Sequence, residues 1–416
     1  MRSVFAAIVS NKISAGAYVT FCMALGALGT GAAHAEGIGP AFNAARESKP
    51  IFEMRWRSET VDQTGMGEDA DAVTLRGRVG FETGKAWSTS FLAEADLLWP
   101  LSTHYNSTVN GKTGYPIVAD PESYEINRLQ LANTSIQDTT VILGRQRINL
   151  DDQRFVGSVG WRQNEQTFDS LHLINKSIPN VTFDVAYVDQ VNRIYGKESP
   201  VGRYHGDTYL ANVSYQFPFG KLTGFSYLLD FDRAPTDSTS TFGMRLAGDR
   251  RMSRFKLAYM VSYATQEEYA NNPRAFNDDF YALELIGTYK QYNLGAGIEV
   301  MEGDGVKGFT TPLATMHKFD GWADKFLTTP PNGLDHRYLL AGYTKKGFSA
   351  LDTLAVNLVY HEFESERLAL DYGSEVDLQL QAKWQRFNLL LKYATYNAER
   401  FATDTNKLWA QVDYVW

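Results

Sequence analysis

Hydrophobic and polar residues alternate along the chain from about residue 50 to its end. In the stretch "IFEMRWRS", the apolar residues Phe52, Met54 and Trp56 fall on one face of an extended chain, and charged residues fall on the other. The stretch "AVTLRGRVGFE" repeats this arrangement. Successive side chains of a β-strand point to opposite faces, so each stretch predicts a strand with one apolar and one charged face.

The same alternation recurs through the rest of the chain. It is seen in "VTFDVAYVDQ", "TYLANVSYQF", "RFKLAYMVSY", "DFYALELIGTY", "YNLGAGIEVM", "LAVNLVYHEF", "EVDLQLQAKW", "FNLLLKYATY" and "LWAQVDYVW". About eighteen such segments can be counted, and each is close to the roughly ten residues that a tilted strand needs to cross a membrane. Sixteen strands remain an alternative, because the segments around Arg128 and Phe168 break the alternation.

The connections between the segments alternate in length. Every second one is a short turn: "ETGKA", "PFG", "GDRR", "KQYN" and "WQR". The others are longer and polar, as in "WPLSTHYNSTVNGKTGYPIVADPESY" and in the run from Gly303 to Asp335. Short periplasmic turns and long external loops are typical of outer-membrane barrels. The predicted fold class is therefore all-β, a transmembrane antiparallel β-barrel of about eighteen strands.

A soluble β-sandwich or solenoid is the competing interpretation of the strands. A single unbroken series of similar hairpins would be unusual in a sandwich, and no repeat of the length found in propellers is visible. Aromatic residues near the segment ends also suit the two membrane interfaces. The chain ends on "WAQVDYVW", and this amphipathic strand with its terminal Trp416 resembles the signal by which the barrel-assembly machinery recognises such proteins.

The first 35 residues predict a cleaved secretory signal. Basic residues precede an apolar run, and "AHAEG" offers a cleavage site after Ala35. The predicted organisation is therefore a signal peptide at 1–35, a lead-in at 36–49 and a barrel at 50–416, located in the outer membrane. The only cysteine, Cys22, lies in the signal, which leaves the mature chain without disulfides. A net charge of -8 argues against nucleic acid as a partner.

The alternate residues of each strand are expected to face the interior of the barrel. They are rich in charge, and a barrel of this size is too wide for side chains alone to fill, so it encloses a channel unless loops plug it. The expected inward residues are Arg55, Arg57, Arg76, Arg78, Arg128, Arg245 and Arg254, with Glu53, Glu94, Asp96, Asp184, Glu284 and Glu299.

One segment combines arginines with glycines and keeps no regular period. It is "GRQRINLDDQRFVGSVGWRQNEQTFDS", between the fifth and sixth predicted strands on the external side. Its glycines Gly144, Gly157 and Gly160 would let the backbone bend into the bore, where guanidinium groups attract anionic solutes. We expect Arg145, Arg147, Arg154 and Arg162 to line a constriction there, with Asp151 and Asp152 pairing with some of them. The alternative is that these charges only pair across the interior and stiffen the wall.

A second long segment, "FTTPLATMHKFDGWADKFLTTPPNGLDHRY", is more apolar than a solvated loop. Phe319, Trp322 and Phe326 could pack a folded-in loop against the wall, and His317, Lys318 and Lys325 would then face the solute. An external capping loop with its own small core explains the same residues equally well.

These two segments carry a resemblance to a known family. "LGRQRINLDDQRFVGSVGWRQNEQTFDSLHL" and "TTPLATMHKFDGWADKFLTTPPNGLDHRY" resemble the alginate-export (alginate porin-like) family of outer-membrane proteins, over about residues 50–416. The resemblance implies an eighteen-stranded barrel with an arginine-lined pore for an anionic polyuronate such as alginate, and the implied pore residues are Arg145, Arg147, Arg154 and Arg162. The residues fit uptake of acidic oligosaccharides or other organic anions equally well.

Two other functions compete with a channel. An outer-membrane hydrolase is the main rival, since Ser170 lies two residues from His172, but two positions on one strand do not make a nucleophile and an oriented base. The seven histidines, including His361 in "HEFE", show no metal-ligand spacing. A closed adhesin barrel is a further alternative. Acids such as Asp278 and Asp279 could bind calcium weakly, and the competing interpretation is a solvated charged loop. We therefore predict a monomeric channel in outer-membrane lipid, with no enzyme activity, cofactor or metal.

Overall fold

The computed structural model describes residues 39–416. The predicted signal peptide and Cys22 lie outside the described residues. A short helix, α3 (Gly39–Arg46), occupies the predicted lead-in and precedes the barrel, where the sequence pattern gave no sign of a helix. Within the described part of the chain, no helix is both long and apolar enough to cross a membrane.

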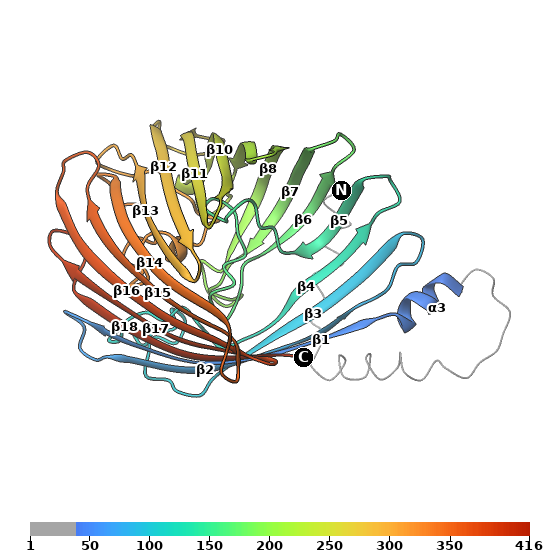
Figure 1. Ribbon diagram of the computed structural model, residues 1–416, viewed down its shortest axis with the longest axis horizontal. Helices are drawn as coiled ribbons and strands as arrows, with labels where there is room; N and C mark the ends of the chain where they lie inside the picture. The colour runs from blue at the N-terminus through green and yellow to red at the C-terminus, as the bar shows by residue number, and fades with distance from the viewer. Residues whose placement is uncertain (1–38) are drawn as a thin grey trace.

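Eighteen strands follow one another round a closed antiparallel barrel (Figure 1). Each strand pairs with its neighbours in the chain, and β1 pairs with both β2 and β18, which closes the ring. This confirms the predicted fold class. The strands are β1 (Lys49–Gln63), β2 (Ala70–Glu82), β3 (Thr89–Pro100), β4 (Ser123–Asn133), β5 (Thr139–Gln146), β6 (Thr167–Asn175), β7 (Val181–Asn192), β8 (Arg203–Phe217), β9 (Gly220–Leu229), β10 (Thr239–Met252), β11 (Phe255–Glu268), β12 (Asn277–Tyr289), β13 (Tyr292–Met301), β14 (Leu334–Phe348), β15 (Leu351–Glu364), β16 (Asp371–Trp384), β17 (Phe387–Ala398) and β18 (Thr405–Val415).

The two places where the alternation breaks are irregularities within strands. The register between β3 and β4 shifts between Glu94 and Ala95, opposite Arg128. The register between β6 and β7 shifts opposite Asp169 and Ser170, near Phe168, and the unpaired residue is Asp189 of β7. A bulge adds one unpaired residue and moves the following side chains to the other face, so the pattern loses phase although the strand continues. The alternative of sixteen strands is therefore wrong.

The apolar faces of the strands point outward and the charged faces point inward. Large apolar side chains such as Leu143, Val213 and Leu358 are exposed on the outer surface, whereas Arg57, Glu94 and most other inward charged residues are buried. This arrangement is the reverse of a soluble protein. A continuous apolar outer belt round a polar interior suits a barrel surrounded by lipid.

The short connections lie at one end of the strands. Residues 290–291 and 385–386 each form a two-residue turn whose first residue, Lys290 or Gln385, has a positive φ. One expected turn is displaced: β10 continues through "GDRR", so that the turn consists of Ser253 and Arg254. Arg254 therefore lies in an exposed turn, and its expected position inside the barrel is wrong, because the alternation extends only as far as the strand does.

Two of the long connections at the opposite end contact the inner wall. The first inner segment comprises residues 147–166, between β5 and β6, and the second inner segment comprises residues 302–333, between β13 and β14. They share an apolar core with inward residues of the wall: Phe155 of the first segment contacts Phe225 of β9 and Phe280 of β12, and Phe309 of the second packs beside them. Figure 1 shows connecting traces inside the ring of strands. Both segments therefore lie inside the barrel, against its inner wall.

Candidate functional site

The strand that leads into the first inner segment contains a glycine that its backbone requires. Gly144, near the end of β5, has a φ of +117°, and a Cβ there would collide with the carbonyl oxygen of Leu129 on β4. Only glycine adopts such a conformation without strain. Arg145 follows within β5 and pairs with Asp169 of β6 at 2.7 Å, so it belongs to the wall and not to the loop.

The start of the segment is held to strands β8, β9 and β10. Asp151 accepts hydrogen bonds from Lys221 Nζ at 2.6 Å and from Asn212 Nδ2 at 2.9 Å. Asp152 accepts one from Arg245 Nη2 at 2.9 Å. The two carboxylates therefore pair with basic residues of the wall, and the expected side-chain pairing with the segment's own arginines is wrong, because the segment reaches those strands.

Arg154 attaches the first inner segment to β13. Its Nε lies 2.9 Å from both carboxylate oxygens of Glu299, and its Nη1 donates to Thr311 Oγ1 at 3.1 Å. Asp320 of the second inner segment lies 3.5 Å from its Nη2. Its side chain is 4 % exposed, so Arg154 is enclosed in a charged cluster and does not face an aqueous passage. A sequence pattern identifies a charged side chain, but the partners that enclose it come from strands distant in the chain.

The end of the segment is held by β1. Arg57 Nη2 donates to the carbonyl oxygen of Trp161 at 2.6 Å, and its guanidinium carbon lies 4.1 Å from the centroid of the indole ring. Arg162 pairs with Glu59 of β1 at 3.1 Å and with Asp324 of the second inner segment at 3.2 Å. Like Arg154, Arg162 is buried and ion-paired. Both residues tie the segment to the wall across the interior.

The second inner segment is fixed to the first one and to β17. His317 stacks on Trp161, with ring centroids 4.7 Å apart. Burial and the nearby Lys392 ammonium lower the pKa of His317 to about 3, so its imidazole is neutral. Its Nδ1 then donates to Asp324 at 2.6 Å, and its Nε2 accepts from Lys392 Nζ at 2.7 Å. His317 is therefore buried, and the expectation that it faces solute is wrong.

Lys392 of β17 lies among three indole rings. Its Nζ is 3.6 Å from the centroid of Trp322, 4.2 Å from that of Trp161 and 5.4 Å from that of Trp409. A cation over aromatic faces is attracted by their quadrupoles, more strongly when water is excluded. Both inner segments are thereby attached to the wall at one point.

The two inner segments also bond directly to each other. Gly157 N donates to the carbonyl oxygen of Leu313 at 3.0 Å, and Gln166 Nε2 donates to the same oxygen at 3.0 Å. Lys318, which is exposed, donates from Nζ to the carbonyl oxygen of Asp152 at 2.7 Å. The segments therefore form one connected layer inside the barrel.

A cluster of charges lies where this layer meets strands β3 and β4. Arg128 Nη2 lies 2.5 Å from Glu94, and Arg147 Nε lies 2.7 Å from Glu165 and its Nη2 3.6 Å from Glu94. The exposed fractions differ sharply between the partners: 17 % for Arg128 and 28 % for Arg147, but 0 % for Glu94 and 4 % for Glu165. The two acid side chains are therefore covered, whereas the side chains of Arg128 and Arg147 are partly exposed.

The remaining inward charges form ion pairs along the wall. Arg78 lies 2.6 Å from Asp96, and Arg55 lies 2.6 Å from Asp413. Arg76 and Arg78 both lie 3.4 Å from Glu53, whose side chain is 28 % exposed, so at this point the acid is the more accessible partner. Asp184 and Glu284 accept from wall residues, His172 and Tyr338 respectively, at 2.6 and 2.7 Å.

A cavity of about 540 Å³ lies at the long-loop end, between the two inner segments. Arg162, Arg193, Tyr204, Asp324 and Lys325 are among the residues that line it. The sequence pattern did not identify Arg193 and Tyr204 as residues that line this cavity. It also did not identify Lys392 as a contact between the wall and the inner segments. An isolated lysine between apolar residues in "FNLLLKYATY" was an available signal for Lys392, whereas nothing in the pattern marks the other two.

The groups considered for catalysis or metal binding are held in other contacts. Ser170 Oγ donates to the carbonyl oxygen of Phe168 at 3.3 Å, and His172 contacts Gln146 and Asp184. His361 Nδ1 lies 2.8 Å from His336 Nε2. Within residues 39–416, no group of three or more His, Cys, Asp or Glu side chains is placed to hold a metal ion.

Comparisons with known proteins identify the fold. No family model matches the chain, and no curated protein matches it. Among solved structures, OpdK of Pseudomonas aeruginosa with vanillate aligns with a TM-score of 0.72 and 13 % identity, over 89 % of this chain and 99 % of that one. OccAB4 of Acinetobacter baumannii aligns with a TM-score of 0.69 and 16 % identity, over 89 % and 98 % of the two chains. A second structure of OpdK, described as an outer membrane protein, gives a TM-score of 0.69 at 14 % identity, over 89 % and 99 % of the two chains.

These similarities show that the chain shares the overall fold of OpdK and OccAB4. The similarity to the alginate-export family specifically therefore rests on the sequence segments alone.

Proposed function

We propose that the protein is an outer-membrane channel through which anionic solutes diffuse, and that small organic anions and short acidic saccharides are its substrates. The observation that carries this proposal is the unequal exposure within the Arg128–Glu94–Arg147 cluster. The Glu94 side chain is covered while the side chains of Arg128 and Arg147 are partly exposed, which favours a solute meeting positive charge although the cluster contains acids. Guanidinium groups bind carboxylates bidentately, and low-dielectric walls concentrate their field.

The size of the solute follows from the two inner segments. Both contact the wall at several strands, and they bond to each other through Leu313 and through the Trp161–His317 stack. A passage beside such a layer favours single carboxylates or short uronate oligomers over a long polyuronate chain such as alginate. The structurally similar OpdK was solved with vanillate, a compact carboxylate of this kind, which supports the same size class.

The test is ion selectivity of the chain from residue 36 onward, refolded into planar bilayers under a salt gradient. The wild type is expected to prefer anions. Arg147→Gln uncovers Glu94 and Glu165 as well as removing a charge, so the anion-to-cation permeability ratio should fall by about threefold or more, because one charge near a narrow passage contributes about 1 kcal/mol. A silent or cation-selective wild type would overturn the proposal.

Matched variants separate the effect of the Arg147 charge on ion selectivity from the effect of a changed structure. Arg147→Lys keeps the charge and should retain most of the preference for anions. Arg250→Gln removes an exposed arginine near the short turns and should change little. Glu53→Gln removes an accessible acid and is expected to shift the ratio in the opposite direction, towards anions. Swelling of vesicles in glucuronate compared with neutral sugars then identifies the permeating solute.

The selectivity should also depend on pH through Lys325. Burial, followed by the positive charge of Lys407, lowers the pKa of Lys325 to about 8, and this lysine lines the cavity at the long-loop end. Its ammonium is present at pH 7 and largely lost at pH 9, so the preference for anions is expected to decrease over this interval. Lys325→Gln should show a smaller decrease between the same two pH values. An equal decrease in the variant would contradict the assignment to Lys325.

A further inference from the structure

The short turns differ in charge from one side of the barrel to the other. Those that join β10 to β11, β12 to β13, β14 to β15 and β16 to β17 contain the stretches "DRRMSRFK", "KQ", "KKGFSALD" and "KWQR", which hold nine basic residues and two acids. The short turns from β2 to β9 contain "ETGKAWS", "TSIQD", "KSIPN" and "PFG", which hold two basic residues and two acids. We call the first four the basic turns, and their basic residues are Arg250, Arg251, Arg254, Lys256, Lys290, Lys345, Lys346, Lys383 and Arg386.

The positive charge of the basic turns is not neutralised by the protein. Among these nine side chains only Lys256 has a carboxylate in ion-pair contact within residues 39–416, that of Asp249 at 3.3 Å. The other acid, Asp352, accepts a hydrogen bond from the backbone N of Gln385 at 2.7 Å. The basic turns therefore present a surplus of free cations.

Two of these cations lie on the outer side of the wall. Side chains alternate along β14, so Lys345 shares the face of Leu339, which is 60 % exposed. Lys290 follows on the neighbouring strand end, because the pairing of β13 with β14 continues to the hydrogen bond from Thr344 N to Gln291 O at 2.8 Å. The Nζ of Lys290 is 5.3 Å from the ring centroid of Tyr289, which is also exposed on the outer face.

An aromatic row marks the membrane level of these two lysines. It runs across four paired strands and consists of Phe255, Tyr289, Tyr292 and Tyr343. Exposed aromatic residues of outer-membrane barrels lie at the membrane interfaces. Lys345 comes two residues after Tyr343 on the same face, so its ammonium group lies at the level of the lipid headgroups.

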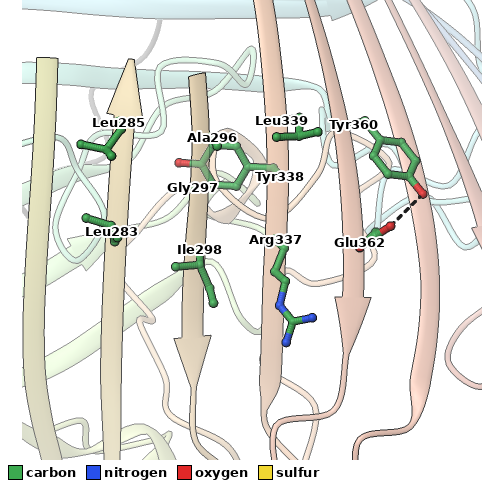
Figure 2. Close-up of a pocket in the computed structure, with 10 residues that line it drawn as sticks. All are labelled: Leu283, Leu285, Ala296, Gly297, Ile298, Arg337, Tyr338, Leu339, Tyr360 and Glu362. Atoms are coloured by element: carbon green, nitrogen blue, oxygen red, sulfur yellow. Dashed lines mark hydrogen bonds between the residues drawn. The ribbon is translucent and has the colours of Figure 1, made fainter. Parts of the chain in front are cut away.

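The apolar surface beyond the aromatic row has the height of one leaflet. Figure 2 shows Leu285, Ala296 and Leu339 side by side on this surface. Leu339 and Lys345 are separated by six residues of β14, about 20 Å along the strand. A strand tilt of about 40° reduces this to about 15 Å of depth, which is half of the hydrocarbon core. The lipid that meets Lys345 therefore belongs to the leaflet on the side of the short turns, which is the periplasmic leaflet.

The charges of the basic turns select among the headgroups of that leaflet. A lipid with one phosphate and no ammonium group complements free lysine and arginine side chains. The ammonium group of a zwitterionic lipid gains little, because Asp249 and Asp352 are already in contact with other groups. An anionic glycerophospholipid is therefore favoured on this side of the barrel.

We propose that the basic turns bind anionic phospholipids of the periplasmic leaflet, with the phosphate of a lipid of the phosphatidylglycerol type between Lys290 and Lys345. The proposal requires that the barrel spans the outer membrane with its short turns on the periplasmic side. It is independent of whether the barrel conducts anions.

The test measures which lipids stay on the protein. The barrel is reconstituted into nanodiscs of equal phosphatidylglycerol and phosphatidylethanolamine, extracted in a mild detergent and analysed by native mass spectrometry. About fivefold more phosphatidylglycerol than phosphatidylethanolamine is expected on the wild type. The double variant Lys290→Gln with Lys345→Gln should bring this ratio to less than about twofold, because the phosphate loses both cations.

Matched double variants separate this site from charge in general. Lys85→Gln with Lys176→Gln removes two exposed lysines from short turns on the other side of the barrel and should leave the ratio unchanged. Lys290→Arg with Lys345→Arg keeps both charges and should also keep the preference.

Two results would overturn the proposal. One is equal retention of the two lipids by the wild type, which would indicate that the basic turns serve a soluble acidic partner in the periplasm. The other is a ratio that the Lys290→Gln, Lys345→Gln variant leaves unchanged. Ion selectivity of this variant is expected to equal that of the wild type, since both lysines lie outside the channel, and this measurement keeps the lipid result separate from the test of the channel.

Discussion

Arg154→Ala is expected to lower the free energy of unfolding by about 3–5 kcal/mol, because it leaves a buried carboxylate without its partner. Glu299 accepts hydrogen bonds from Arg154 Nε and Nη2, and Asp320 lies close by with both carboxylate oxygens buried and otherwise without hydrogen bonds in the described residues. Loss of the Arg154 side chain should also release the first inner segment from β13. The current through the open channel should then fluctuate more, and its mean conductance should rise. Urea unfolding of the protein in lipid vesicles measures the change in the free energy of unfolding. Single-channel recording measures the change in conductance.

A double variant shows whether the loss comes from the uncompensated acid. Arg154→Met combined with Glu299→Gln removes both charges and keeps much of the volume, so it should recover a large part of the stability lost in Arg154→Ala. Arg250→Ala, at an exposed position, serves as the control and should change the free energy of unfolding by less than about 0.5 kcal/mol. If Arg154→Ala unfolds like the control, the pairing with Glu299 does not hold the segment in place.

Trp161→Ala is expected to cost about 3–5 kcal/mol as well, because one indole ring is shared by the first inner segment, the second inner segment and the wall. The ring carries Arg57 of β1 on its face at 4.1 Å, Lys392 of β17 at 4.2 Å and His317 in a stack at 4.7 Å. Its removal leaves a cavity and weakens both cation contacts. We expect rapid conductance fluctuations, since both inner segments lose an attachment.

The chain supplies a matched control for this variant. Trp87 lies in the connection between β2 and β3 and is 66 % exposed, so Trp87→Ala removes the same side chain without opening an internal cavity. It should leave both stability and conductance nearly unchanged. Steady conductance in Trp161→Ala, with a stability equal to that of Trp87→Ala, would show that the two inner segments are held by other contacts.

The barrel fold could be predicted because the sequence features that specify it lie within short stretches of the chain. Alternation in stretches such as "LAVNLVYHEF" sets the face of each side chain, and the lengths of the connections set the two ends of the barrel. The errors have local causes too. A bulge at Asn127 broke the period in β4, and the extension of β10 beyond "GDRR" moved Arg254 from the interior to a turn.

The inner segments were recognised by composition, but their geometry was not predictable. Arginines in a glycine-containing segment indicated contact with the interior, and the sequence named Arg154 and Arg162 as residues that would face a solute. The structure encloses both in ion pairs with Glu299 and Glu59, which are more than a hundred residues away in the chain. Exposure is set by all neighbours of a side chain, and those neighbours are known only when the barrel closes.

The sequence by itself therefore determined the fold class, the orientation of the two strand faces and the identity of the two unusual segments, because each depends on periodicity or composition within a short stretch. Only the tertiary structure decided which charges remain accessible. Arg147 and Glu94 are both charged residues in the sequence, of opposite sign, yet the Arg147 side chain is 28 % exposed and that of Glu94 0 %. This difference arises when β3, β4 and the first inner segment are brought together, and it decides the sign of the surface that a solute meets.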